Sequence, residues 1–205
     1  IGTLSHGIMI SENNGKNWRY SARRINNIPI RCLYTNGNMV LAGADNGIHR
    51  SMNKGDTWEH VNNGVQVNGF TEVNHKIYAA LMNGATMTND NGLTWTYIYK
   101  PHTLHDISTD GKHIYAMTLG AGLKKSGNDG RSWQDVNNGL GTYNLYTFEL
   151  KRFDEKIFAA QWYGIYVSDN GGQAWSLIRN GLPDSTAFLT LEKTRNGLIA
   201  GIGRR

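Results

Sequence analysis

An eight-residue motif that occurs five times constrains the fold of this chain more than any other feature. The shared frame is Ser/Thr-x-Asn/Asp-x-Gly-x-x-Trp, and successive copies begin 40, 37, 38 and 42 residues apart. The copies read SENNGKNW (11–18), SMNKGDTW (51–58), TNDNGLTW (88–95), SGNDGRSW (126–133) and SDNGGQAW (168–175). A period near 40 residues is typical of repeat proteins, in which each repeat covers the apolar faces of its neighbours.

Each repeat reads as four short strands joined by tight turns. In the unit at 30–61, IRCLYT and MVLAGA flank an Asn-Gly turn, GIHRS follows a second turn, and the motif leads into WEHV. Asn-Gly pairs favour hairpin turns because both residues accept positive φ at little cost. The same plan fits 67–99, 104–136 and 145–179. Four antiparallel strands in each repeat of this length predict an all-β propeller of four-stranded blades.

The motif itself is predicted to be structural. Its Ser/Thr and Asn/Asp side chains can hydrogen-bond the backbone of the turn between the third and fourth strands, and its Gly permits the bend. Its Trp is expected to fold back into the blade core instead of contacting a ligand. These structural residues are Ser11, Asn13, Gly15, Trp18, Ser51, Asn53, Gly55, Trp58, Thr88, Asp90, Gly92, Trp95, Ser126, Asn128, Gly130, Trp133, Ser168, Asn170, Gly172 and Trp175.

These residues resemble the Asp-box, or bacterial-neuraminidase repeat, family. GIYVSDNGGQAW (164–175) is very close to the family pattern, and the five phased copies extend the resemblance over essentially the whole chain. The family Asp is kept at Asp90 and replaced by Asn in the other four copies. The resemblance implies a propeller whose boxes lie on one face and whose ligands bind on the other. Sialidases, xyloglucanase-type hydrolases, sortilin-type receptors and photosystem II assembly factors all carry such boxes, so the resemblance implies a fold and not one function.

The two ends of the chain are expected to share a blade. The C-terminal segments AFLTLEK and LIAGIG read as first and second strands, and the N-terminal segments GIMIS and WRYS read as third and fourth strands. Joined as residues 187–203 plus 1–22, they would complete a fifth blade and leave no open sheet edge. Residues 1–205 are therefore predicted to form a single five-bladed propeller domain.

Two segments of the sequence match the second strand of that closing blade. IGTL (1–4) and IAGI (199–202) both align with LAGA (41–44), which is a second strand of a complete repeat. Either copy could form the closing strand. The alternative is that the chain is a piece of a longer propeller array.

Composition argues against several kinds of partner. Charged residues make up 18% of the chain with a formal net charge of +5, and the Lys and Arg residues are scattered, so nucleic-acid binding is not predicted. No apolar run is long enough for a transmembrane helix. The single Cys32 permits no internal disulfide. The chain starts at Ile1, which is compatible with a removed export signal, and we expect an extracellular or periplasmic location.

Catalytic patterns are weak. The sialidase resemblance implies three converging arginines, but Arg23, Arg24 and Arg31 come from one segment and later blades lack counterparts. A xyloglucanase-like pair of carboxylates would require two acids across the channel, for which Asp45 and Asp184 are the candidates. We favour the simpler interpretation, in which both acids are ordinary loop residues. The question of enzyme activity stays open, and a non-catalytic role is preferred.

No metal or cofactor is predicted. His102 and His105 have the spacing of a ligand pair and His113 follows, but no third ligand on the same face is evident. The segment DISTDG (106–111) mimics the start of a calcium loop, yet Met117 stands where that loop requires Glu.

A binding site is predicted on the face opposite the boxes, where the repeat is most irregular. Trp162 is the only Trp outside a box, and with Tyr163 it could form an apolar platform edged by guanidinium groups; alternatively, Trp162 fills the central channel. We predict a non-catalytic recognition or scaffold propeller that binds a glycan or a protein surface, which could be acidic. A degenerate glycoside hydrolase is the alternative. The predicted binding residues are Trp162, Tyr163, Tyr143, Arg23, Arg24 and His6.

Overall fold

The computed structural model of the chain describes residues 1–21, 25, 27–142, 145–183 and 186–203. Every named element in these ranges is a β-strand. Four sheets contain four antiparallel strands each, and two further sheets contain two strands each. The prediction of an all-β chain built from four-stranded antiparallel blades is therefore confirmed. The described residues include no helix long and apolar enough to cross a membrane.

Each complete blade follows chain order from its first to its fourth strand. The first and second blades contain β3 (Ile30–Asn36), β4 (Met39–Ala44), β5 (Gly47–Ser51) and β6 (Glu59–Asn63), then β7 (Val67–Val73), β8 (Lys76–Leu81), β9 (Gly84–Thr88) and β10 (Thr96–Tyr99). The third and fourth contain β11 (Leu104–Thr109), β12 (Ile114–Thr118), β13 (Leu123–Ser126) and β14 (Gln134–Asp135), then β15 (Thr147–Phe153), β16 (Lys156–Gln161), β17 (Gly164–Ser168) and β18 (Ser176–Ile178).

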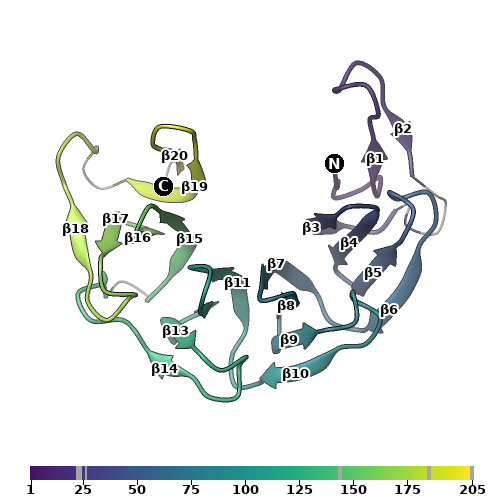
Figure 1. The fold of residues 1–205 in the computed structure, drawn as a ribbon. Helices are drawn as coiled ribbons and strands as arrows, with labels where there is room; N and C mark the ends of the chain where they lie inside the picture. The colour runs from purple at the N-terminus through teal and green to yellow at the C-terminus, as the bar shows by residue number, and fades with distance from the viewer. Residues whose placement is uncertain (22–24, 26, 143–144, 184–185, 204–205) are drawn as a thin grey trace.

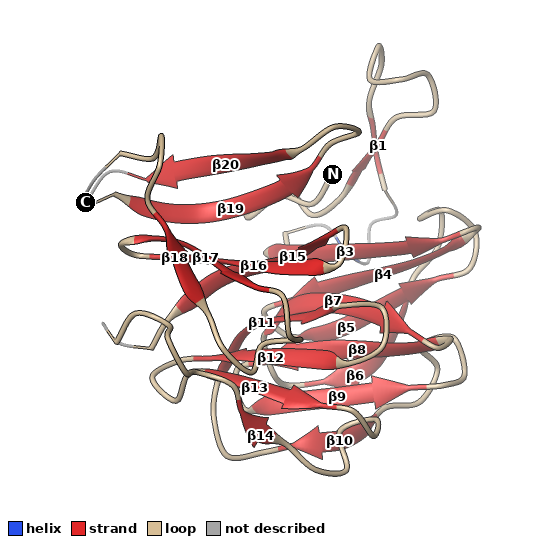
Figure 2. Cartoon of the chain, turned by 60° about the vertical axis from the view of Figure 1, so that its left-hand side comes forward, coloured by secondary structure: helices blue, strands red, loops and turns tan. Residues whose placement is uncertain are grey.

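The blades stand side by side along an arc. Figure 1 shows the first strands β3, β7, β11 and β15 at the inside of the arc and the fourth strands at its outside. Each inner strand contacts the inner strand of the next blade. Figure 2 shows β19 (Ala187–Lys193) and β20 (Leu198–Gly203) stacked on the fourth blade. Successive sheets therefore bury their apolar faces against each other, as a repeat architecture requires.

The Asp box forms the network of hydrogen bonds that the motif predicts. In the box at 51–58, the amide of Gly55 donates to Ser51 Oγ at 2.8 Å, and the amide of Thr57 donates to Asn53 Oδ1 at 2.9 Å. The indole of Trp58 donates to the carbonyl of Gly55 at 3.0 Å. Gly55 has a φ of 92°, a conformation that costs other residues free energy, so the box requires Gly at this place.

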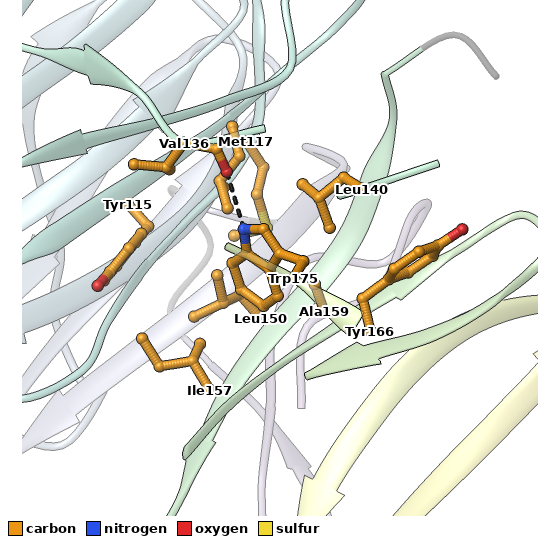
Figure 3. Packing of buried hydrophobic residues seen from close by; sticks show 10 residues of the cluster. Tyr115, Met117, Val136, Leu140, Leu150, Ile157, Ala159, Tyr166 and Trp175 are labelled. Atoms are coloured by element: carbon orange, nitrogen blue, oxygen red, sulfur yellow. Dashed lines mark hydrogen bonds between the residues drawn. The ribbon is translucent and has the colours of Figure 1, made fainter. Parts of the chain in front are cut away.

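The box tryptophan packs on the preceding blade, not within its own blade as predicted. Trp175 belongs to the fourth blade, but its indole donates to the carbonyl of Val136 in the third blade at 2.8 Å. Figure 3 shows the indole among Tyr115 and Met117 of that third blade and Leu150 of its own. The tryptophan is thus a tie between neighbouring sheets.

The prediction that all five box tryptophans are core residues is wrong for Trp18. Trp58 and Trp175 are buried, and Trp95 and Trp133 are partly buried against the blade before them. Trp18 is 45% exposed. The physical reason is its position in the two-stranded N-terminal sheet of Met9–Ile10 and Arg19–Tyr20, against which the described residues place no preceding sheet.

The predicted composite fifth blade is not formed within the described residues. β1 (Met9–Ile10) and β2 (Arg19–Tyr20) make one two-stranded sheet, and β19 and β20 make another. Figure 1 shows these two half-blades facing each other across the opening of the arc. The place beside β1 that a second strand would take is occupied by the chain start, because Gly2 bridges Ile8 and the amide of Met9 donates to the carbonyl of Ile1 at 2.9 Å. Each copy of the duplicated segment therefore belongs to its own half-blade.

A matched pair of substitutions tests the role of the box tryptophan. Trp175→Ala should lower the free energy of unfolding by about 3–5 kcal/mol, because it empties a buried aromatic site between two blades. Trp18→Ala removes the same side chain from the same motif. In dilute protein it should change the free energy of unfolding by no more than about 0.5 kcal/mol, because that indole is exposed. Urea denaturation measures both, and equal losses for the two variants would contradict the interblade role.

Candidate ligand-binding site

A β-bulge recurs at the same place in all five inner strands. In β11, for example, Leu104 pairs with Thr118 and Asp106 pairs with Met117, so that His105 is left without a partner in the ladder. A bulge turns a side chain away from the regular alternation of the strand. The five bulge residues are Arg31, Asn68, His105, Phe148 and Leu189. These side chains occupy equivalent positions along the inner edge of the arc.

Aromatic rings gather at the bulges of the third and fourth blades. The ring centroids of His105 and Tyr146 are 4.9 Å apart, and those of Tyr146 and Phe148 are 4.6 Å apart. Phe148 in turn meets Trp162 edge-on with a centroid separation of 4.9 Å. Edge-to-face contacts at these distances are the favourable arrangement for aromatic pairs. We refer to His105, Tyr146, Phe148 and Trp162 as the aromatic cluster.

A hollow of about 560 Å³ opens beside the aromatic cluster. Leu119 and Gly120 lie between the second and third strands of the third blade, and Trp162 lies at the equivalent place in the fourth. Because the boxes lie between third and fourth strands, this hollow is at the opposite end of the strands from the boxes. The described residues that line it are Leu119, Gly120, Thr142, Leu145, Tyr146 and Trp162.

The inner strands also carry a carboxyl group that titrates near neutral pH. Asp106 remains partly accessible, but its carboxyl is crowded by protein, and this burial raises its pKa to about 7, with a further contribution from the charge of Glu149. The amide of Ile107 donates to Asp106 Oδ1 at 2.8 Å and partly offsets the burial. Gly69 of the second blade makes room for this carboxyl, since a Cβ there would lie 1.9 Å from Asp106 Oδ1.

Glu149, on the next inner strand, is occupied by structural hydrogen bonds. Its Oε2 accepts from Thr190 Oγ1 at 2.6 Å and from the amide of Leu191 at 2.8 Å. Its Oε1 lies 3.0 Å from Lys151 Nζ. These contacts join β15 to β19, so the Glu149 carboxylate is committed to holding the fourth blade and the C-terminal half-blade together.

The predicted binding residues divide into three groups. Trp162 borders the hollow, and its neighbour Tyr163 is exposed. Tyr143, Arg23 and Arg24 lie outside the described residues, as does Asp184, the candidate catalytic partner of Asp45. His6 is exposed in the N-terminal half-blade, where its Nδ1 lies 2.7 Å from Ser5 Oγ, and three complete blades separate that half-blade from the one that carries Trp162.

The acid Asp45 is occupied by an ion pair. Arg31 Nε donates to Asp45 Oδ1 at 2.6 Å, and Arg31 Nη2 approaches the other oxygen at 3.3 Å. Arg31 is the bulge residue of the first blade, so its guanidinium is held at the edge of the arc by a loop acid of the same blade. This pairing agrees with the interpretation of Asp45 as an ordinary loop residue.

The histidines that suggested a metal pair do not meet. His102 Nδ1 lies 2.9 Å from Tyr99 Oη, and His113 Nδ1 lies 2.8 Å from Asp110 Oδ2. His105 belongs to the aromatic cluster. Among the described residues, no group of three or more His, Cys, Asp or Glu side chains could hold a metal ion.

Comparison with known proteins places the fold. No protein-family model matches the chain, and no curated protein matches its sequence. An ancestral GH74 enzyme superposes with a TM-score of 0.77 at 16% identity over 90% of this chain. YCF48 bound to a D1 peptide gives 0.66 at 14% over 90%, and the GH74 enzyme of Niastella koreensis gives 0.71 at 19% over 98%. The fold is that of an Asp-box β-propeller.

The likeness to these structures extends to the fold alone, since all three identities are below 20%. The chain spans 30%, 64% and 39% of the lengths of the ancestral GH74 enzyme, YCF48 and the Niastella enzyme, respectively. The activity and ligands of those proteins therefore do not follow for this Asp-box propeller from the comparison.

The titration of Asp106 should be visible in the pH dependence of stability. Its pKa in the folded protein is about 7, above the value of about 4 in an unfolded chain. A raised pKa means that its contribution to stability is complete below about pH 4 and is lost as the pH rises through about 7. Asp106→Asn should therefore gain stability relative to the parent by on the order of 2–4 kcal/mol between pH 4.5 and pH 8.

Urea denaturation of parent and variant at several pH values measures this difference. His49, whose pKa is lowered to about 4 by burial and then by His60, has the opposite pH dependence, but it is common to both proteins and cancels. Glu192→Gln is the matched control, because that carboxylate is 70% exposed and lies on the inner strand β19, beyond β15. A difference that does not change with pH would show that the Asp106 carboxyl is solvated.

Proposed function

We propose that this propeller is a non-catalytic recognition domain that binds a protein segment at the hollow beside Trp162. The observation that supports the proposal is the hollow itself: about 560 Å³, bordered by an indole and a phenol ring, at the end of the blades opposite the boxes. Clefts of this size, mostly apolar and with few polar groups, are typical of binding sites on rigid scaffolds.

The aromatic cluster gives the hollow a rigid wall. Trp162 packs edge-on against Phe148, which packs against Tyr146, and Phe148 is fixed at the bulge of the inner strand β15. A ring fixed by its neighbours loses little conformational entropy when a ligand contacts it. Large aromatic side chains held in this way are the residues that most often dominate the affinity of protein interfaces.

The lining favours an apolar anchor over a sugar. Leu119 and Leu145 face the hollow, and Leu119 is 47% exposed. Among the side chains that line the described part of the hollow, only Thr142, Tyr146 and Trp162 carry a polar group. Recognition of a sugar requires several directed hydrogen bonds to its hydroxyl groups, whereas an aliphatic or aromatic side chain of a protein requires mainly apolar surface. A glycan ligand is therefore the second choice.

The net charge of +5 adds a preference for acidic ligands. The structure of YCF48 with a D1 peptide is an example of a peptide held by a protein of this fold, at 14% identity. That example supports a protein segment as the ligand without identifying it.

A glycoside hydrolase is the alternative, and one observation favours it. Asp106 has the raised pKa of a general acid and lies near the carboxylate of Glu149. Both Glu149 oxygens, however, are engaged in contacts within the protein, so this carboxylate is committed to structure and not free to act as a nucleophile or base. Turnover of an aryl glycoside that disappears in Asp106→Asn would establish the hydrolase instead.

The proposal predicts a specific effect of Trp162→Ala on binding. Peptides selected from a random library on the immobilised parent should bind Trp162→Ala at least about tenfold more weakly, a loss of about 1.4 kcal/mol or more. Tyr97→Ala is the matched control, because Tyr97 is 38% exposed on the outer strand β10, and its binding should equal that of the parent. Titration calorimetry measures the affinities, and a glycan array tests the second choice of ligand.

Folding is checked first by the melting temperature of each variant. If Trp162→Ala melts early, Trp162→Leu keeps apolar volume beside the hollow and serves in its place. A folded Trp162 variant that binds selected peptides like the parent would place the ligand elsewhere.

A further inference from the structure

Every box in the complete blades is seated on the sheet before it. A Cβ added to Gly55 would lie 2.8 Å from Ile10 Cδ1, one added to Gly92 would lie 2.7 Å from a Leu41 methyl group, and one added to Gly130 would lie 2.7 Å from Ile98 Cδ1. In each case the neighbour belongs to the preceding blade. The box glycine and tryptophan thus act together as a wedge that fits a seat on the previous sheet.

The N-terminal half-blade presents the same wedge fully formed. The amide of Gly15 donates to Ser11 Oγ at 2.8 Å, the amide of Asn17 donates to Asn13 Oδ1 at 2.8 Å, and the Trp18 indole donates to the Gly15 carbonyl at 3.0 Å. A Cβ at Gly15, however, would meet only the Trp18 ring of the same box, at 3.7 Å. The box is folded, but among the described residues nothing of another blade lies against its glycine.

The fourth blade carries a seat with the same parts. Trp175 is held by Val136 and Leu140 of the third blade, and its amide donates to the carbonyl of Asn138 at 2.9 Å. Moved along the chain by the 42-residue interval between the last two boxes, these positions become Ile178, Leu182 and Asn180. All three line an apolar groove of about 450 Å³ between the fourth blade and the C-terminal half-blade.

Two glycines show that one seat is filled and the other is open. A Cβ at Gly139 would lie 2.2 Å from the carbonyl oxygen of Trp175, so the arriving box presses on that glycine. The equivalent residue 42 positions later is Gly181, and a Cβ there would meet no described atom within 4 Å. Beside the groove, Ile199 and Ile202 of β20 are each 61% exposed. This edge therefore resembles an interblade interface from which the wedge is missing.

We infer that the seat at Ile178, Asn180 and Leu182 binds the box hairpin, residues 7–20, of a second copy of this chain. The contact continues the four interfaces that the chain already makes between its own boxes and seats. The wedge and the seat of one copy lie at opposite ends of the arc, so each copy can contact two others. Such a head-to-tail contact extends to chains or rings of copies instead of stopping at a dimer.

The copy's own hairpin is the less suitable occupant. It is fixed to the first blade, since Trp58 Nε1 donates to Ser21 Oγ at 2.7 Å and Ile8 is buried in the same cluster as Trp58. Figure 1 shows it across the opening from the seat. Bringing the two together within one molecule would require repacking of close-packed interfaces between the complete blades.

Docking requires that one of the two segments that could form the second strand leaves its present position. Ile1–Thr3 beside β1 and β20 beside β19 would compete for the same place next to the arriving hairpin. Ile1–Thr3 is held by the bridge at Gly2 and by backbone hydrogen bonds to Gly7, Met9 and Ile30. This contact is shorter than the ladder between β20 and β19, which extends from Ala187 to Lys193. The chain start is therefore the segment that gives way, and deletion of residues 1–4 should strengthen association.

Complementing variants test the contact. Trp18→Ala keeps the seat and loses the wedge, and Leu182→Asp keeps the wedge and loses the seat. Sedimentation velocity should show species larger than a dimer for the parent as concentration rises, and monomers for each variant alone. An equimolar mixture of the two variants should form a one-to-one dimer and nothing larger, because only one intact wedge and one intact seat remain. Tyr97→Ala should associate like the parent.

Ile202→Asp, at an exposed edge position, replaces Leu182→Asp if that variant fails to fold. A parent that remains monomeric at all concentrations, with or without residues 1–4, would overturn the inference. So would variants that fail to complement each other. A monomer in which the Trp18 indole becomes protected after deletion of residues 1–4 would instead show closure within one chain, and would equally refute a second copy as the occupant.

Discussion

In each complete blade the indole of the box tryptophan packs against the preceding sheet, and the arrangement of sheets depends on that contact. Trp175 joins the fourth blade to the carbonyl of Val136 in the third, and Trp133 joins the third to the carbonyl of Ile98 in the second. A blade of four short strands has two apolar faces and cannot bury both by itself. The box therefore has two functions: its hydroxyl and amide groups hold a turn, and its indole fixes the spacing to the neighbouring sheet.

The repeated blades hold one β-bulge at the same position in every inner strand. The bulge of each inner strand lies at an equivalent position, but its residue differs from blade to blade, from Arg31 and Asn68 to His105 and Phe148. The first two are used in polar contacts, since Arg31 pairs with Asp45 and Asn68 Nδ2 donates to the carbonyl of Leu104 at 2.6 Å. The aromatic pair supports the wall of the hollow. The bulge residue thus serves internal polar contacts in the first two blades, and it supports the proposed binding site in the third and fourth.

The parts of this structure that could be predicted from sequence are those determined within a few residues. The box hydrogen bonds and the Asn-Gly hairpins depend on local geometry, so the motif predicted the strand pattern of every complete blade. The direction of the indole depends on a sheet some 40 residues away, so the motif alone predicts a buried Trp18 where the structure exposes it. A bulge has no sequence signature, which is why His105 and Phe148 were not linked to Trp162. The burial that raises the pKa of Asp106 is likewise not readable from the sequence, because the carboxyl packs against Gly69 of another blade.

Hydrogen exchange of the indole N–H groups, followed by NMR in dilute monomeric protein, tests the central role of the box tryptophan most directly. The account predicts that the indoles of Trp58 and Trp175, which donate to groups of the preceding blade and are buried, exchange slowly and at similar rates. Among the described residues, the Trp18 indole donates only within its own exposed box, and it should exchange far faster. Protection of Trp18 equal to that of Trp175 in the monomer would contradict the account.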